Sequence, residues 1–185
     1  MPEKDELYSQ RIDGTANFIS ELAKESERSA VVFGASRADA VLEELLRAAI
    51  RPHPGGRDNL FDPDRPLGTF SARISLAFRL GLIDDACEHA LQMLRKLRND
   101  FAHSVTRASL SESHHKHRVT ELVREAKKSP ASYAQHLTYF KTDNATLRAF
   151  CAAVSVIITH LDYTTLLAKP LEAPFTARID LPDKK

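Results

Sequence analysis

Apolar side chains recur every three or four residues along most of this chain, which is the spacing of one face of an α-helix. No stretch shows the convincing alternation of apolar and polar positions that is typical of a β-strand. The pattern therefore predicts an all-α fold, a single-domain helical bundle. We expect helices at residues 15–23, 29–50, from 69 onward, 85–104, 117–128, 130–140 and 144–168.

Prolines, glycines and polar residues mark the breaks between these helices. The stretch "RPHPGGRDNLFDPDRPLG", residues 51–68, predicts an irregular loop that Phe61 fastens to the core. Residues 107–118 are predicted to be a polar loop, and residues 169–185 an extended tail. At 185 residues the chain suits one domain, 1–185, with its core at about 15–168.

The sequence also bears on the cellular compartment and on whether the two cysteines form a disulfide. The N-terminus is charged and has no apolar leader segment. The longest apolar run, "FCAAVSVIITHL", looks too short and interrupted to span a membrane. We therefore expect a cytoplasmic protein with no membrane partner. Cys87 and Cys151 lie in apolar helical patterns, which favours two buried free thiols over the alternative of a disulfide.

Charge is balanced overall, at +1, but uneven along the chain. Residues 91–118 hold six Lys or Arg against two acidic residues, a local excess of four positive charges, and four histidines. Such a patch suits a polyanion such as RNA, although many solvated faces look the same.

The stretch "RKLRNDFAHS", residues 95–104, lies within this basic region. On a helical wheel Ala90, Leu94, Leu97 and Phe101 form one narrow apolar stripe. Asn99 and His103 are four residues apart, nearly opposite that stripe, and Arg95 extends their row. Arg98 lies at the edge between the apolar and polar faces.

These side-chain types can cleave RNA without a metal or cofactor. Imidazole exchanges a proton near neutral pH, so His103 can serve the 2′-OH. The guanidinium of Arg98 can stabilise a phosphorane, and Asn99 can orient the ring or a ribose hydroxyl. The alternative is an ordinary solvated helix face that contains a histidine.

The arrangement Arg98-Asn99-x-x-x-His103 resembles the motif of the HEPN superfamily, an arginine followed by a polar residue and, a few positions later, a histidine near a helix end. The resemblance implies an all-α homodimer in which two subunits bring their motifs together at the interface. It also implies a metal-independent endoribonuclease, often a toxin or defence effector, with Arg98, Asn99 and His103 as the catalytic site.

A second resemblance covers residues 25–104, carried chiefly by Leu60-Phe61-Asp62, Pro66-Leu67 and "FSAR" at 70–73. These segments are similar to the mannitol operon repressor family, which is named for transcriptional regulation. The chain shows no recognisable helix-turn-helix, so direct DNA binding fits poorly. The alternative function is thus a non-catalytic regulator or protein-interaction module.

Three further features have two readings each. Arg73 falls on the apolar arc of its helix, where it either ties down the loop of Asp62 and Asp64 or serves, with Arg95 and Lys96, as a substrate-binding cation. The histidines of "HHKH", 114–117, suggest metal, but no carboxylate or cysteine lies near them at ligand spacing, so we expect no metal site. "GASR", 34–37, is a small-residue patch that permits close helix packing and not a nucleotide motif.

The sequence thus predicts an RNA-cleaving helical homodimer, with RNA and a protein partner such as an antitoxin as candidate partners.

Overall fold

The computed structural model describes residues 2–53, 55, 58–104 and 108–172, and within those ranges it contains helices and no strands. The predicted all-α single-domain bundle is therefore confirmed. The helices are α1 (Pro2–Leu22), α2 (Glu27–Ala49), α3 (Phe70–Arg79), α4 (Asp85–His103), α5 (Ser113–Ala126), α6 (Pro130–Leu137) and α7 (Ala145–Leu167).

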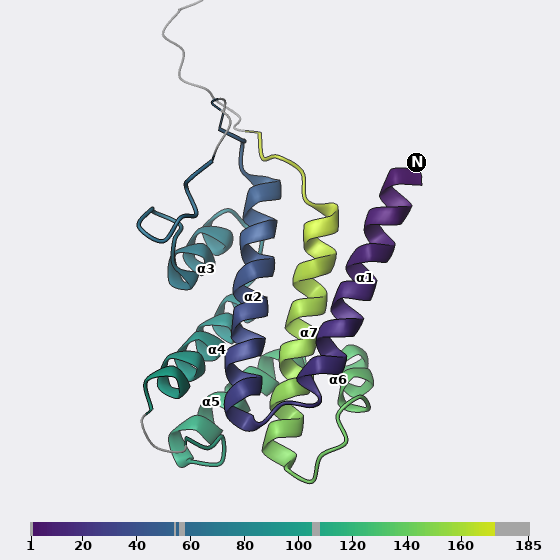
Figure 1. The fold of residues 1–185 in the computed structure, drawn as a ribbon, viewed down its shortest axis with the longest axis vertical. Helices are drawn as coiled ribbons and strands as arrows, with labels where there is room; N and C mark the ends of the chain where they lie inside the picture. The colour runs from purple at the N-terminus through teal and green to yellow at the C-terminus, as the bar shows by residue number, and fades with distance from the viewer. Residues whose placement is uncertain (1, 54, 56–57, 105–107, 173–185) are drawn as a thin grey trace, which may run out of the picture.

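Helix α7 lies at the centre of the bundle, between α1 and α2 in Figure 1, and it also contacts α5 and α6. Its closest partner is α2, where the small-residue patch predicted at 34–37 faces it. A Cβ atom added to Gly34 would meet Val154 Cγ1 at 3.0 Å, so Val154 would have to shift to admit a larger side chain at this crossing. The close-packing interpretation of "GASR" is confirmed.

Polar side chains at the predicted positions begin several helices. Thr69 accepts a hydrogen bond from the backbone N–H of Ala72 at the start of α3. Asp84 does the same for Cys87 at the start of α4, and Asn144 caps α7. These caps satisfy backbone donors that a helix leaves unpaired at its first turn, which is why the helices start there.

Helix α6 ends at Leu137, short of the predicted 140, and two predicted helix starts are wrong. Helix α1 extends back to Pro2, although only its second half carries the apolar spacing; Tyr8 and Ile12 are about half exposed. Helix α5 begins at Ser113, inside the stretch predicted to be a loop. Between residues 113 and 118 one residue is buried, the polar His115, whose ring packs on Phe101 with centroids 4.8 Å apart.

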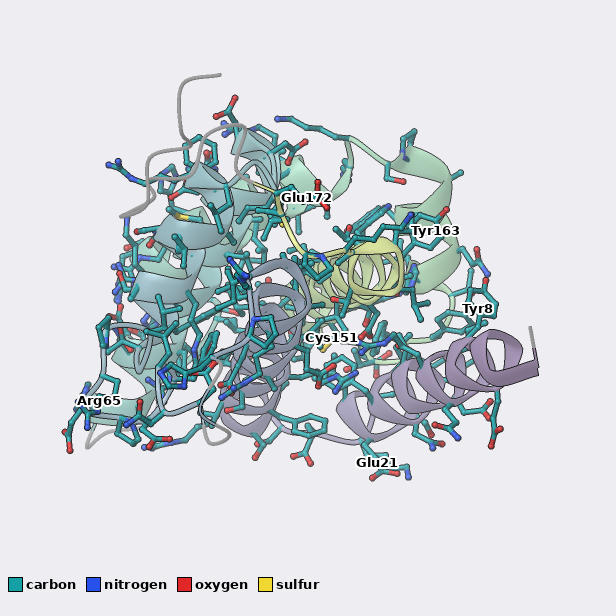
Figure 2. The ribbon with its side chains drawn as sticks, turned by 90° about the horizontal axis from the view of Figure 1, so that it is seen from above. Tyr8, Glu21, Arg65, Cys151, Tyr163 and Glu172 are labelled. Carbon is teal, nitrogen blue, oxygen red and sulfur yellow. The ribbon has the colours of Figure 1, made fainter. Side chains whose placement is uncertain are left out.

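The apolar helix α7 has 23 residues, so it is longer than its central apolar run suggests. By length and composition alone it is long enough to cross a membrane, and 61% of its most apolar window is buried within the fold. Cys151, near the centre of the molecule in Figure 2, belongs to this helix and is a free thiol. Cys87 is also free, as predicted, but it is only partly buried, so the expected burial holds for Cys151 alone.

The tail predicted at 169–185 is described only as far as residue 172, where it is not helical; the rest lies outside the described residues.

Candidate functional site

Helix α4 is held in place by the predicted apolar stripe. Ala90, Leu94, Leu97 and Phe101 are all fully buried, and they pack α4 against α2, α3 and α5. The last turn of the helix ends at His103, where the backbone N–H of Ser104 bonds to the carbonyl of Asp100 over 3.0 Å. This packing fixes the orientation of α4, and with it the position of the polar side of the helix.

The three proposed catalytic residues lie on that polar side. Arg98 and His103 are exposed and Asn99 is partly buried. Arg98 Nη1 donates to Asn99 Oδ1 over a long 3.5 Å. His103 forms no hydrogen bond or ion pair with any residue that the structure describes, and none joins it to Arg98. One chain therefore pairs Arg98 with Asn99 and leaves the imidazole uncommitted.

The two proposed substrate-binding cations of α4 also reach solvent. Arg95 is partly buried, and its Nε donates to Gln92 Oε1 over 3.0 Å. Lys96 is exposed and has no partner among the described residues. Arg107, the next cation of the basic patch, lies outside those residues.

Arg73 is not part of this surface. The residue is 8% exposed, and its side chain donates to the loop carbonyls of Leu67, over 2.8 Å, and Phe61, over 3.3 Å. It also forms ion pairs with Asp39, at 2.8 Å, and Glu43, at 2.7 Å. The prediction that Arg73 ties down the loop at 58–68 is confirmed.

Two details of the Arg73 prediction need correction. The carboxylates that hold Arg73 are those of Asp39 and Glu43 on α2, rather than loop carboxylates. A role as a substrate-binding cation is wrong, because burial and these four bonds leave the guanidinium no face for a phosphate. Phe61 anchors the loop as predicted, being 4% exposed with the Arg47 guanidinium 4.0 Å above its ring.

Asp39 forms an ion pair with Arg73 and also lies within electrostatic range of Arg98 in the candidate site. Burial raises the pKa of its carboxyl, and the positive charges of Arg73 and, more weakly, Arg98 counteract that rise. The sequence pattern did not identify Asp39 and Glu43 as the carboxylate partners of Arg73. Their spacing of four residues on one helix, which places two carboxylates side by side, was the available signal that a cation lies between them.

A second polar cluster lies where α4 meets α5. His115 is 3% exposed; its Nδ1 is 2.8 Å from the carbonyl oxygen of Ser109, and its Nε2 is 3.3 Å from Asp100 Oδ2. His114 Nε2 is 3.9 Å from the same carboxylate oxygen, and Arg118 Nη1 also contacts it. The premise that no carboxylate lies near "HHKH" is therefore wrong, because the fold brings Asp100 there from the preceding helix.

A groove of about 680 Å³ lies elsewhere, between α1, α6 and α7. Tyr8 and Tyr163, at the same edge of the molecule in Figure 2, stand on its two sides. Asp162 lies at its base, buried and bonded to Arg11 over 2.7 Å and to Thr15 over 2.6 Å. This carboxylate is engaged in joining α1 to α7. The imidazole of His136, which also lines the groove, lies 2.8 Å from the carbonyl oxygen of Ser132 and 3.2 Å from Thr159 Oγ1, so among the described residues neither group is left uncommitted.

Comparison of the chain with family models, curated proteins and solved structures finds no match.

Proposed function

We propose that this protein is a metal-independent endoribonuclease whose site is Arg98, Asn99 and His103. The observation that carries the proposal is the state of His103. Its imidazole is exposed at the end of a helix anchored by four buried side chains, and it has no partner within the described chain. An exposed imidazole with no partner among the described residues, one turn beyond an arginine–asparagine pair, supports a role on a substrate. The likeness of these residues to the HEPN motif supports the same assignment.

The chemistry assigned to these groups is a transesterification. His103 takes the proton from a ribose 2′-OH, and the 2′-oxygen attacks the adjacent phosphorus. The bond from phosphorus to the 5′-oxygen then breaks, which leaves a 2′,3′-cyclic phosphate and a 5′-OH. The Arg98 guanidinium stabilises the charge of the pentavalent phosphorane, and Asn99 orients the ribose or the ring.

The leaving 5′-oxygen needs a proton, and one chain supplies a single histidine in this motif. A symmetric dimer would place a second His103 opposite the first, so that one accepts a proton while the other donates one. Arg95 and Lys96, both on the same helix, would hold flanking phosphates. Dimerisation through α4 is therefore part of the proposal.

The test is cleavage of total cellular RNA by the purified chain in the presence of EDTA. We expect wild type to cleave. His103→Ala should lose activity by about 10²–10⁴-fold, as loss of a general base does. Arg98→Ala should lose at least about 10²-fold, or roughly 3 kcal/mol of transition-state stabilisation.

His117→Ala is the matched control, because His117 is an exposed histidine on α5 outside the motif. It should cleave at the wild-type rate. Equal cleavage by wild type and His103→Ala would refute the mechanism. A folded wild type that never cleaves RNA but binds a protein partner tightly would favour the alternative, a non-catalytic regulator or interaction module.

A further inference from the structure

We infer that Asp100, His114 and His115 form a binding site for a divalent transition-metal ion of the Zn²⁺ class, which clamps α5 to the last turn of α4. This site goes beyond the proposed function, since the ribonuclease chemistry above uses none of these three side chains. The three ligand atoms, one carboxylate oxygen and two imidazole nitrogens, all lie within 4.8 Å of one another. Asp100 lies on α4 and the two histidines lie on α5, so a bound ion would join the two helices.

The hydrogen-bonding state of His115 points to a cation. A carbonyl oxygen can only accept, so the 2.8 Å contact with Ser109 requires a hydrogen on Nδ1. In neutral imidazole Nε2 then carries a lone pair, and that lone pair faces Asp100 Oδ2 at 3.3 Å. Nε2 is buried and has no hydrogen-bond partner in the part of the chain that the structure describes. Two electron-rich atoms at this distance repel each other unless a proton or a metal ion lies between them, and the contact does not have hydrogen-bond geometry.

The surroundings of His115 match the usual support of a metal ligand. Metal-bound histidines almost always donate their second ring N–H to a carbonyl or carboxylate, which fixes the ring and its tautomer. Ser109 supplies that carbonyl, with Glu112 Oε2 3.9 Å from the same Nδ1. Phe101 packs on the ring from α4, so Nε2 has little freedom to turn away from Asp100.

The donor set selects the class of ion. Two imidazole nitrogens and one carboxylate oxygen suit Zn²⁺, Co²⁺ or Ni²⁺, whereas Mg²⁺ and Ca²⁺ prefer oxygen ligands alone. His114 is exposed and Asp100 partly so, which gives an ion a path from solvent.

Arg118 competes with the ion, because its Nη1 contacts the Asp100 oxygen that faces both histidines. Its side chain is about one quarter exposed, so the guanidinium can move into solvent when the ion binds. Removing this positive charge should therefore strengthen metal binding. That expectation separates an ion held by Asp100 from one held by surface histidines alone.

The test uses the full chain, freed of metal with a chelator, and titrations with Zn²⁺ by calorimetry and with Co²⁺ by visible absorption. We expect one ion per chain and a Zn²⁺-dependent rise in Tm. Loss of an outer contact to a metal ligand typically weakens binding by about 10- to 100-fold, so His114→Ala, which removes a ligand, should cost at least about tenfold. Because His114 is exposed, this variant should keep the wild-type far-ultraviolet circular dichroism.

Two further variants complete the test. His117→Ala, the neighbouring histidine outside the cluster, should bind Zn²⁺ as wild type does, and Arg118→Gln should bind it more tightly. Absence of saturable binding by wild type would overturn the inference. So would equal weakening in His114→Ala and His117→Ala, or unchanged or weaker binding in Arg118→Gln.

Discussion

Arg73 Nη1 donates a hydrogen bond to Asp39 Oδ1 over 2.8 Å, and this bond joins α3 to α2 beside the candidate site. Asp39 also feels the charge of Arg98, the proposed phosphorane-stabilising residue on α4. This carboxylate thus bonds the arginine that holds the loop at 58–68, and its pKa also responds to the charge of the arginine assigned to the chemistry. Three helices meet around it, so its environment depends on all of them.

Replacement of Arg73 should destabilise the fold rather than alter chemistry directly. Arg73→Ala removes the donor from Asp39 and from two loop carbonyls, and leaves Glu43 with Arg47 alone, so the free energy of unfolding should fall by roughly 3 kcal/mol. Urea denaturation at neutral pH measures this change. Arg79→Ala, an exposed arginine on the same helix, is the control and should change stability by less than about 0.5 kcal/mol. Equal stability of the two variants would contradict the structural role.

Glu125 should make stability depend on pH in the acid range. Burial alone would raise the pKa of its carboxyl, but hydrogen bonds from Lys128 and Arg124 lower it to about 2 from an ordinary 4.5. Because the folded-state pKa is depressed, this contribution is present above pH 4.5 and is lost as pH falls toward 2.

Glu125→Gln should therefore destabilise the chain by about 1–2 kcal/mol at pH 7 through weaker charge-assisted bonds, and by much less at pH 2. Chemical denaturation at the two pH values measures the difference. Glu6→Gln, at an exposed position, should show no such pH dependence. A Glu125→Gln effect that is the same at both pH values would contradict the assignment.

The two cysteines should be unreactive in the folded chain. Burial raises the pKa of Cys151 to about 12, and burial together with Asp84 and Glu88 raises that of Cys87 to about 12. Both thiols then stay protonated at pH 8, and alkylation by iodoacetamide should be far slower than in urea. Because the folded-state pKa values are raised above 9, the stability that the two buried, protonated thiols contribute is fully present below pH 9. It is lost as pH rises toward 12. Rapid alkylation of folded Cys87 would contradict this.

Apolar periodicity predicted the helices well where burial decides, and poorly where it does not. Leu94, Leu97 and Phe101 are fully buried as their spacing requires. The first half of α1 has no such stripe, because Tyr8 and Ile12 stay half exposed, and the start of α5 rests on one buried histidine. An apolar stripe predicts a helical segment only where that segment buries several side chains, and these two segments bury too few.

The sequence predicted the candidate site only where its residues lie on the same helix. Arg98, Asn99 and His103 are close in sequence, so helical geometry alone placed them. Asp100 and His115 meet across two helices, and no local spacing reports a tertiary contact of that kind. Arg73 was recognised as buried from its place on the apolar arc, but its carboxylate partners on α2 lie 30 or more residues away.

The proposed mechanism requires a dimer, since each chain contributes one His103. We expect light scattering at micromolar concentration to give twice the chain mass. Introducing a like charge at the exposed Ala102, next to His103, as Ala102→Arg, should weaken association and cleavage together. The monomeric fold should persist, because Ala102 lies outside the core. A strict monomer that cleaves RNA would contradict dimerisation.

The chemistry of the RNA ends tests the central claim most directly. A short RNA, incubated with wild type in EDTA and analysed by mass spectrometry, should yield 2′,3′-cyclic phosphate and 5′-OH ends, and the same RNA with 2′-O-methyl groups should stay intact. His103→Ala should produce neither end. Products with 3′-OH and 5′-phosphate ends, cleavage of the methylated RNA, or the same cyclic product from His103→Ala at the wild-type rate would contradict the account.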